Sequence, residues 1–284
     1  MPTAPRRILV AVGSLEVGGA ERQIVEIARL LQGPEFDFRV VTTAGGGPLE
    51  EPLRRTGAAM QALSPAGTAL PASKVERGRR AVRNALRLRE VIRAWRPDVL
   101  HAYMTETSAV AAAARWPHRR PFFIFSKRSL VQWIARDRIY YPLVRWTNAR
   151  CDLILANSNA VRDEAIAKEG VSAEKIRVVY NGVDTDLYAP GPRPETLARE
   201  LGIPENATVI GMVANLHLYK GHLEVLTALS RIDASSDVRL LFVGREGNAS
   251  EAVREAVARL GLAARVLFAG PRSDIPDLLR LMDV

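Results

Sequence analysis

Short apolar runs alternate with longer amphipathic segments along most of this chain, and no other feature restricts the fold as strongly. The apolar runs have the length of strands, whereas the segments between them repeat apolar residues every three or four positions, as helices do. Strands separated by helices pair in parallel, because each helix carries the chain back to the start of the next strand. The sequence therefore predicts an α/β fold with parallel sheets.

Residues 1–183 contain six of these strands. We expect them at Ile8–Val12, Phe36–Thr42, Val99–Ala102, Phe122–Phe125, Leu153–Ala156 and Ile176–Val179. We expect helices at Gly19–Leu31, Ala81–Trp95, Thr105–Arg115, Ile139–Arg150 and Ser158–Glu169. The stretch from Asp184 to Pro194 is rich in proline and cannot sustain a helix or a central strand. We therefore place a first domain at 1–183 and a linker with a connecting segment at 184–206.

A second series of the same kind fills residues 207–284. Its strands are expected at Val209–Val213, Arg239–Val243 and Val266–Phe268, and its helices at Lys220–Arg231, Ala249–Leu260 and Ile275–Leu281. The chain ends at Asp283-Val284, where a further strand would begin. Three parallel strands leave an unpaired edge and make half of a nucleotide-binding fold. We expect the second Rossmann-like domain to be incomplete and the chain to be a fragment.

Composition and charge narrow the class of protein. The 284 residues are 48% hydrophobic and 25% charged, which is typical of a globular protein with packed cores. The one cysteine, Cys151, excludes an internal disulfide framework, and no apolar run reaches the ~18 residues of a membrane span. We expect a cytoplasmic protein.

The charge is unevenly distributed along the chain. Residues 1–150 carry a net charge of +13 and residues 151–284 carry −4, so an anionic partner is expected to meet the first half.

The junction after the strand Val209–Val213 has the composition of an anion site. An apolar strand runs into a loop, and Lys220-Gly221 opens an amphipathic helix. The first N–H groups of a helix lack intrahelical partners and the helix dipole is positive there, so a phosphate beside a lysine ammonium would satisfy both. In the alternative interpretation, Lys220 only solvates a helix start.

A second glycine-containing turn, Gly18-Gly19, follows the first strand. It matches neither of two common phosphate motifs, because Ala20 stands where a nucleotide-hydrolase loop needs Lys-Ser/Thr, and Gly-x-Gly-x-x-Gly is absent. The glycines let backbone N–H groups approach a ligand closely. A plain strand-to-helix turn is the alternative.

Four motifs in order resemble the retaining glycosyltransferases of glycosyltransferase family 4. They are Val17-Gly-Gly-Ala-Glu-Arg22; Arg96-Pro-Asp-Val-Leu-His101; Ala156-Asn-Ser-Asn-Ala-Val161 with Lys175-Ile-Arg-Val-Val-Tyr-Asn-Gly-Val-Asp184; and Val213-Ala-Asn-Leu-His-Leu-Tyr-Lys-Gly-His222. Leu241-Phe-Val-Gly-Arg-Glu-Gly247 and Val266-Leu-Phe-Ala-Gly-Pro271 continue the resemblance to the end of the chain. It implies two Rossmann-like domains of the GT-B type, and sugar transfer from a nucleotide-diphosphate donor with retention and without a metal or other cofactor.

The resemblance also implies roles for residues. It gives Lys220 and His101 as catalytic residues, and Tyr103 and Arg128 as acceptor contacts. The donor-binding residues it implies are Gly18, Gly19, Asn215, His217, Lys220, Gly221, Gly244, Arg245, Gly270 and Pro271. The expected partners are a nucleotide-sugar donor and a lipid-linked or glycan acceptor, with no nucleic acid.

The chain departs from the family pattern at several points. Asn215 stands where the family usually has an arginine, five residues before the phosphate lysine, and we expect a protonated His217 to supply part of the missing charge. The family's frequent His-x-His is here His101-Ala-Tyr103. Two donor-binding glutamates and a terminal helix lie beyond the last residue in the family, so we expect this fragment to be inactive alone.

Metal binding is not expected. Asp184-Thr-Asp186 lies between a strand and a proline-rich segment, where capping of the turn is favoured over metal coordination. The four histidines, His101, His118, His217 and His222, lack zinc spacing and an accompanying cysteine pair.

The helix that ends at Trp95 is predicted to have an apolar side and a basic side. Its apolar side carries Ala81, Ala85, Leu88, Ile92 and Trp95. Its basic side carries Arg79, Arg80, Arg83 and Arg87, which are either a solvated face or a contact with anionic lipid heads on the inner face of the membrane. Arg128, in a loop that precedes Trp133, is the candidate acceptor contact.

Two other functions remain open from the sequence. One is a metal-dependent nucleotide-sugar enzyme or epimerase, which a chelator would inactivate. The other is a non-catalytic module that binds a nucleotide or an anionic surface, which would bind without turnover.

Overall fold

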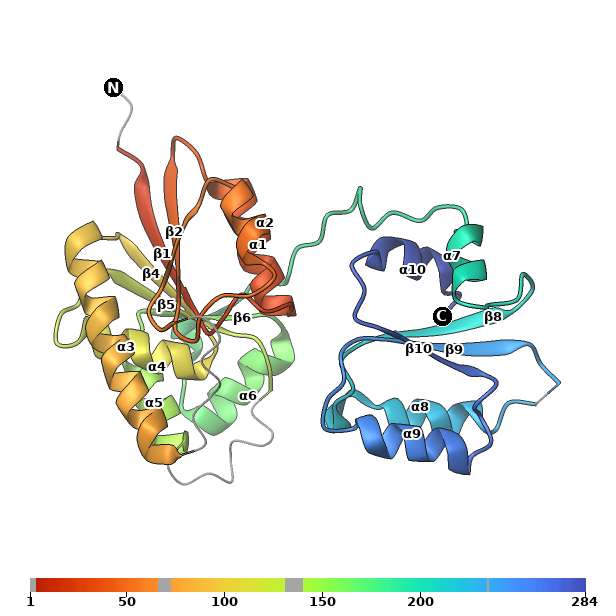
Figure 1. Cartoon of the computed structure of the whole chain (residues 1–284). Coiled ribbons are helices and arrows are strands. Elements are labelled where there is room, and N and C mark those ends of the chain that lie inside the picture. The colour runs from red at the N-terminus through yellow and green to blue at the C-terminus, as the bar shows by residue number, and fades with distance from the viewer. Residues whose placement is uncertain (1–3, 66–72, 131–139, 234) are drawn as a thin grey trace. The chain divides into compact units, whose positions relative to one another are not determined.

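The computed structural model of the chain describes residues 4–65, 73–130, 140–233 and 235–284. The chain forms two compact units, Met1–Gly182 and Val183–Val284, and each has its own sheet (Figure 1). Within the described residues, no helix is both long and apolar enough to cross a bilayer.

The first unit is built on a parallel sheet, which has seven strands among the described residues. In spatial order these are β3 (Ala59–Ala62), β2 (Phe36–Thr42), β1 (Arg6–Val12), β4 (Val99–Tyr103), β5 (Phe122–Lys127), β6 (Leu153–Ala156) and β7 (Ile176–Val178). β1 lies inside the sheet between β2 and β4, and its Val10 is in register with His101 of β4. The parallel α/β architecture is as predicted.

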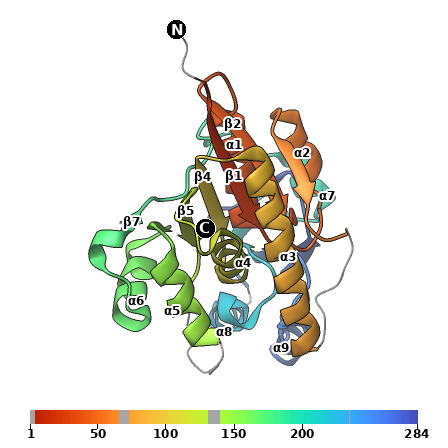
Figure 2. The ribbon, with the colours of Figure 1, turned by 90° about the vertical axis from the view of Figure 1, so that its left-hand side faces the viewer.

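Helices cover both faces of this sheet, and successive residues of the inner strand β1 point to opposite sides. Leu9 and Ala11 belong to one core, and Val10 and Val12 belong to the other. The first core is covered by α3 (Lys74–Trp95), α4 (Thr105–Arg115), α5 (Tyr140–Arg150) and α6 (Asn159–Glu169), and the second by α1 (Gly19–Leu31) and α2 (Glu50–Arg55) (Figures 1 and 2). A short 3-10 turn, η2 (Ala173–Lys175), precedes β7.

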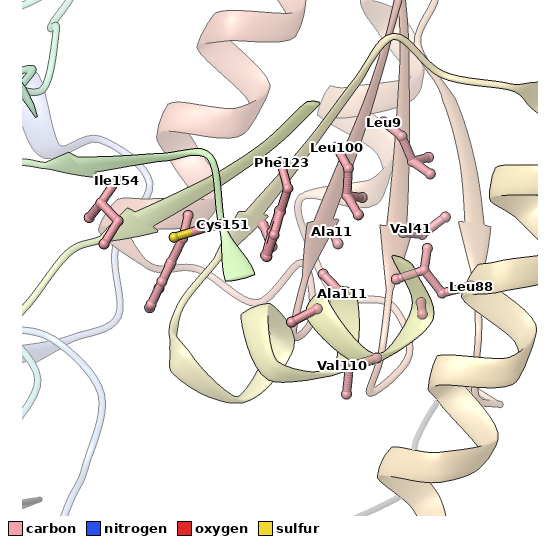
Figure 3. Packing of buried hydrophobic residues seen from close by; sticks show 14 of the residues in the cluster. Leu9, Ala11, Val41, Leu88, Leu100, Val110, Ala111, Phe123, Cys151 and Ile154 are labelled. Carbon is pink, nitrogen blue, oxygen red and sulfur yellow. The ribbon is translucent and has the colours of Figure 1, made fainter. Parts of the chain in front are cut away.

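Small side chains let α4 pack closely against the sheet in the first core. Ala111 and Ala112 of this helix are almost fully buried. Figure 3 shows Val110 and Ala111 of α4 and Leu88 of α3 beside the strand residues Leu9, Ala11 and Leu100.

The second unit repeats the plan on a smaller scale. The described residues give a parallel sheet in the order β10 (Val266–Gly270), β9 (Val238–Val243) and β8 (Thr208–Val213). Helices α8 (His222–Leu229) and α9 (Ser250–Arg259) cover one face, and α7 (Glu195–Glu200) and α10 (Ile275–Leu281) cover the other. The outer edge of β8 is paired by the last residues, since Asp283 N–H donates to Val209 O at 2.8 Å and Gly211 N–H donates to Val284 O at 2.7 Å.

Two predicted elements need correction. Segment 184–206 is not only a linker, because α7 lies in it and its Leu197 and Ala198 are buried in a core of the second unit. The helix predicted at Lys220–Arg231 is also wrong in its limits. A 3-10 turn, η3 (Leu218–Lys220), comes first, and Gly221 with a φ of 87° separates it from α8, because a left-handed residue cannot continue a right-handed helix.

Candidate functional site

The candidate donor site of the second unit lies where its three parallel strands end. The loop 214–221 follows β8, the loop 244–249 follows β9, and Gly270-Pro271 ends β10. Ala214 N–H donates to Val243 O at 2.8 Å, and Gly244 N–H donates to Gly270 O at 2.9 Å. The structure thus brings together the predicted donor-binding glycines of all three strands at the carboxyl edge of the sheet, where α/β folds bind their ligands.

The start of α8 provides backbone donors at this edge. The first intrahelical bond runs from Val225 N–H to Gly221 O at 3.1 Å, so the N–H groups of His222, Leu223 and Glu224 come before the first N–H that donates within the helix. The N–H of Lys220 is already used, because it donates to His217 O at 2.9 Å. The Lys220 N–H is therefore not among the unpaired donors of this junction, and those of α8 begin at His222.

The side chain of Lys220 is exposed at this junction. Its ammonium lies 5.2 Å from the ring centre of Tyr219, a residue that is 75% exposed. The His217 ring stacks on Tyr219 with 5.7 Å between centroids, and its Nδ1 lies 3.2 Å from Asn248 Oδ1. Lys220 therefore stands as an exposed positive charge beside a stacked pair of rings.

Gly244 and Gly247 are required by close approach of the loops. A Cβ on Gly244 would lie 2.2 Å from Ala214 O, and a Cβ on Gly247 would lie 2.4 Å from Leu216 O. Both distances are far below van der Waals contact with backbone atoms. The glycines are therefore what allows the loops after β8 and β9 to pack against each other.

We expect Gly244→Ala to destabilise the second unit by about 1–3 kcal/mol or more, since backbone must move to admit the methyl group. Gly261→Ala is the matched control, because Gly261 also has a positive φ, of 66°, but has nothing within 4 Å of the place that the methyl group would occupy. Urea unfolding followed by far-UV circular dichroism compares the two. Equal losses in both variants would show that the crowding at Gly244 has no special cost.

In the first unit, the structure gathers the predicted acceptor-side residues at the ends of β4 and β5. His101 Nε2 and Ser126 Oγ share a hydrogen bond of 2.7 Å, and the His101 and Tyr103 rings lie 4.5 Å apart. The Arg128 guanidinium lies 5.1 Å from the Tyr103 ring centre, and its Nη1 donates to Asn181 Oδ1 at 2.5 Å. Tyr103 is only 1% exposed, so it supports Arg128 and offers almost no surface to an acceptor.

The surroundings hold His101 and Tyr103 in their neutral forms. Burial, with a smaller contribution from the Arg128 charge, lowers the pKa of His101 to about 3. Burial raises the pKa of Tyr103 to about 12 against the opposing effect of Arg128. A neutral His101 can exchange hydrogen bonds with a hydroxyl but carries no charge at neutral pH.

Glu21 is a residue of this site that the sequence interpretation did not single out. It lies in the first turn of α1, and a Cβ on Gly18 would meet its Oε2 at 2.3 Å, so the carboxylate folds back over the Gly18-Gly19 turn. Burial raises the pKa of Glu21, while its own backbone N–H and Arg128 oppose that shift. The position of Glu21, three residues after the cap residue Gly18, was the available signal in the sequence. A glutamate at that position commonly folds back to accept from the free backbone N–H groups at the helix start.

Gln23 and Arg128 hold the segment around Gly182 against the first unit. Gln23 Nε2 donates to Gly182 O at 2.6 Å, and Gly182 N–H donates to Gln23 Oε1 at 3.2 Å. Asp184 Oδ1 then accepts from the N–H groups of Asp186 and Leu187, both at 3.1 Å. The prediction that Asp184 caps a turn is confirmed. Among the described residues, no group of three His, Cys, Asp or Glu side chains could hold a metal ion.

One of the four arginines on the predicted basic face of α3 is buried, so the prediction is wrong for Arg80. Arg80 is 9% exposed and donates to Thr43 O at 3.2 Å, and Arg87 donates to Leu63 O. Carbonyl groups at the ends of β2 and β3 need donors there, and the long arginine stems reach them. Arg79, Arg83 and Arg87 remain exposed. Trp133 and Ile139, which the sequence interpretation also used, lie outside the described residues.

Sequence profiles of known families match almost the whole chain. The profile described as Glycosyltransferase Family 4 matches residues 17–187, and the profile described as Glycosyl transferases group 1 matches residues 194–284. EpsD of Bacillus subtilis (strain 168) is 26% identical over an alignment of 212 residues, and the match covers 69% of this chain and 54% of EpsD. The D-inositol 3-phosphate glycosyltransferase of Rhodococcus jostii (strain RHA1) is 29% identical over an alignment of 190 residues, and the match covers 54% of this chain and 41% of that protein. The chain thus spans about half the length of these curated relatives.

The fold is shared with solved structures. The crystal structure of Anabaena Alr3699/HepE in complex with UDP-glucose superposes with a TM-score of 0.81 at 24% identity, over 98% of this chain and 72% of that one. At this identity the likeness establishes the fold. The predicted GT-B type of α/β fold is thereby confirmed.

Proposed function

Because the chain belongs to glycosyltransferase family 4, we propose that the whole protein that contains it transfers a sugar from a nucleoside-diphosphate sugar to an acceptor hydroxyl, with retention of configuration and without a metal. The main support is the junction between β8 and α8, where Lys220 and the first backbone N–H groups of the helix lie at the same edge. The binding of UDP-glucose by HepE, which has the same fold, adds support for a nucleotide-sugar donor.

The proposed mechanism rests on stabilising the leaving group. As the bond from the sugar to the diphosphate breaks, negative charge grows on the phosphate oxygens. The Lys220 ammonium and the dipole of α8 lower the energy of that charge, which is the role a divalent cation has in other enzymes.

On the acceptor side, we assign His101 and Arg128 to contacts with the sugar or the acceptor. His101 shares its Nε2 hydrogen bond with Ser126 and is neutral, so it suits a hydroxyl better than a phosphate. Arg128 is fixed by Asn181 and by the Tyr103 ring, and its charge favours an acceptor with anionic or strongly polar groups. Lipid-linked and glycan acceptors both meet that description.

The test is product analysis with a panel of UDP-, GDP- and ADP-sugars in the presence of EDTA. We expect release of nucleoside diphosphate to continue in EDTA, and proton NMR to show the donor's anomeric configuration in the product. Loss of turnover in EDTA would favour the metal-dependent nucleotide-sugar enzyme or epimerase. Binding of a nucleotide without turnover would favour the non-catalytic module, and an inverted product would overturn retention.

We also propose that α3 meets an anionic membrane surface. Its exposed side carries three apolar residues, Val75, Val82 and Leu86, which are 63%, 61% and 54% exposed. Arg79 and Arg83 lie on the same side, because the spacing from 75 through 79, 82 and 83 to 86 follows the helical repeat. Apolar residues flanked by cations are typical of helices that lie in the interface of a membrane.

We expect the double variant Arg79→Gln/Arg83→Gln to lose binding to vesicles with anionic lipid, by about 1 kcal/mol for each charge removed. Val82→Asp/Leu86→Asp should also abolish binding, because the apolar side chains no longer enter the interface. Arg231→Gln, an exposed arginine of the second unit, is the control. Vesicle sedimentation at low and high salt measures the effect, and equal binding to neutral and anionic vesicles would contradict the proposal.

A further inference from the structure

A pocket of about 490 Å³ lies at the amino ends of β5 and β6 in the first unit, and the proposed function makes no use of it. Its walls come from the end of α4 with the turn that follows, from the end of α5 and the start of β6, and from η2. The volume falls within the range of about 300–1,000 Å³ that is usual for small-molecule sites. The residues that line this amino-edge pocket include Arg115, Trp116, Arg119, Arg150, Asp152 and Lys175.

The amino-edge pocket is well separated from the acceptor-side residues of the same unit. Those residues lie at the carboxyl ends of β4 and β5, whereas the pocket lies where β5 begins at Phe122 and β6 begins at Leu153. β5 has six residues, so the two edges of the sheet are about 15–20 Å apart. A ligand in the amino-edge pocket therefore lies outside the proposed acceptor site.

The lining of the amino-edge pocket has an excess of positive charge. Among the described residues, it contains one carboxylate, Asp152, and four cations, Arg115, Arg119, Arg150 and Lys175. Helices α4 and α5 both end here, and each helix end contributes about half a negative charge. Four positive charges against about two negative ones leave an excess of about two. That excess matches a phosphate monoester, which carries about −1.5 to −2 at neutral pH.

Capping of the two helix ends accounts for only part of this charge. Arg115 Nη1 donates to Arg150 O at 2.8 Å, and Arg115 Nη2 pairs with Asp152 Oδ2 at 2.6 Å. Lys175 Nζ donates to Asn148 O at 2.6 Å. These contacts fix the side chains of Arg115 and Lys175. A carbonyl partner carries no net charge, however, so the positive charge of Lys175 is not neutralised.

Two guanidinium groups of the lining have unused donors. The Nε–H groups of Arg115 and Arg150 are buried, and neither has an acceptor among the described residues. The Arg150 guanidinium lies 4.2 Å from the ring centre of Trp146, which holds its plane without supplying an acceptor. Buried donors without acceptors are rare in folded proteins, and an anion with several oxygens is the kind of ligand that supplies acceptors to arginine.

We propose that the amino-edge pocket binds the phosphate monoester of a small polar molecule, and that Arg119, Arg150 and Lys175 hold the phosphate. Trp116 lines the same pocket and is 57% exposed, so its ring offers a flat face to the rest of the ligand. The pocket is larger than a bare phosphate ion requires, which agrees with a ligand that has such a body. The inference goes beyond the proposed function and does not depend on it, because this site needs no sugar transfer to bind its ligand.

The test is a titration of the 284-residue chain by isothermal calorimetry, with inorganic phosphate and ribose 5-phosphate as probes. Every titration uses the Lys220→Gln background, which weakens the proposed donor site, and about 0.15 M salt, which screens non-specific attraction. We expect Arg119→Gln and Arg150→Gln each to weaken the binding of both probes about tenfold, as for loss of a charge-assisted contact. Arg120→Gln is the matched control, because Arg120 is exposed and is not among the residues that line the pocket, and it should change the affinity by less than about twofold.

Two further variants test effects that a merely structural role would not produce. Asp152→Asn should strengthen the binding of both probes severalfold, because the lining loses a negative charge while asparagine still accepts from Arg115 and from the Phe123 N–H. Trp116→Ala should weaken the binding of ribose 5-phosphate but leave that of inorganic phosphate almost unchanged, because only the sugar phosphate has a body to pack on the ring. Melting temperatures of all variants control for folding.

Each outcome bears on the proposal. If neither probe binds, or if Arg119→Gln or Arg150→Gln binds phosphate as well as its background, the cations only stabilise the helix ends and the proposal is wrong. If Trp116→Ala does not weaken the binding of ribose 5-phosphate, the pocket takes a bare anion and the class of ligand is wrong. Vesicles with phosphatidic acid present the same phosphate monoester on a lipid. Binding to these vesicles that Arg119→Gln abolishes, without binding of either soluble probe, would make the ligand a lipid headgroup and overturn the proposal of a small molecule.

Discussion

Glu169→Leu is expected to lower the stability of the first unit by about 3–5 kcal/mol, because it leaves a buried lysine without its counter-charge. Lys127 Nζ lies 2.5 Å from Glu169 Oε2, and the two side chains are 4% and 1% exposed. Asn148 Nδ2 donates to the same carboxylate oxygen at 2.8 Å. Without the carboxylate, the ammonium would remain against the Phe125 ring, whose centre is 4.4 Å away.

The variant should also become sensitive to pH. Burial already lowers the pKa of Lys127, and Glu169 opposes that shift, so removing Glu169 lowers the pKa further. The unfolded state then binds more protons than the folded state at every pH between the folded pKa and 10.5, and stability rises with pH across that range. The stability of the wild type should change less over the same range.

Urea unfolding followed by tryptophan fluorescence measures this loss in the first unit alone. The four tryptophans of the chain, Trp95, Trp116, Trp133 and Trp146, all belong to that unit. Lys127→Met/Glu169→Leu is the matched control, because replacing both charges by apolar side chains restores most of the stability. A loss below about 1 kcal/mol in Glu169→Leu would show that the buried pair is not required.

The sequence predicted the long periodic elements well and the short ones poorly. The helices Gly19–Leu31 and Thr105–Arg115 and the strands Phe36–Thr42 and Leu153–Ala156 have their predicted limits. Helix α3 starts before the predicted Ala81, because Ser73 caps it by accepting from Val75 N–H at 3.2 Å. Helices α2 and α7, with six residues each, and the edge strand β3 were missed, since they are too short to show a repeat.

The structure brings together several residues that the sequence singled out, but the sequence did not predict their contacts. Sequence reasoning placed His101, Tyr103 and Arg128 on the acceptor side, and the structure brings their side chains together. It could not predict that Arg80 bonds to Thr43 O or that Asn215 bonds to the Arg245 N–H, because both partners are backbone groups far away in the sequence. Such bonds depend on where the folded strands end, which residue spacing does not show.

In the whole protein that contains this chain, Lys220→Ala is expected to lower turnover by roughly a hundredfold or more, which corresponds to about 2.7 kcal/mol or more of lost transition-state stabilisation. Lysine acts here on charge that develops as the nucleotide leaves, so the effect should appear mainly in kcat. The fold should be little changed, because the Lys220 side chain is exposed and its N–H bond to His217 O is retained in alanine. Lys168→Ala is the matched control, since Lys168 is an exposed lysine whose ammonium pairs with Glu164 one helical turn away.

The rate at which Lys220→Ala releases nucleoside diphosphate from the donor sugar tests the proposed mechanism most directly. Our account predicts a rate at least about a hundredfold below the wild type, with an unchanged melting temperature and with Lys168→Ala at the wild-type rate. A Lys220→Ala protein that turns over the donor within about threefold of the wild type would contradict the assignment of the diphosphate to the junction of β8 and α8.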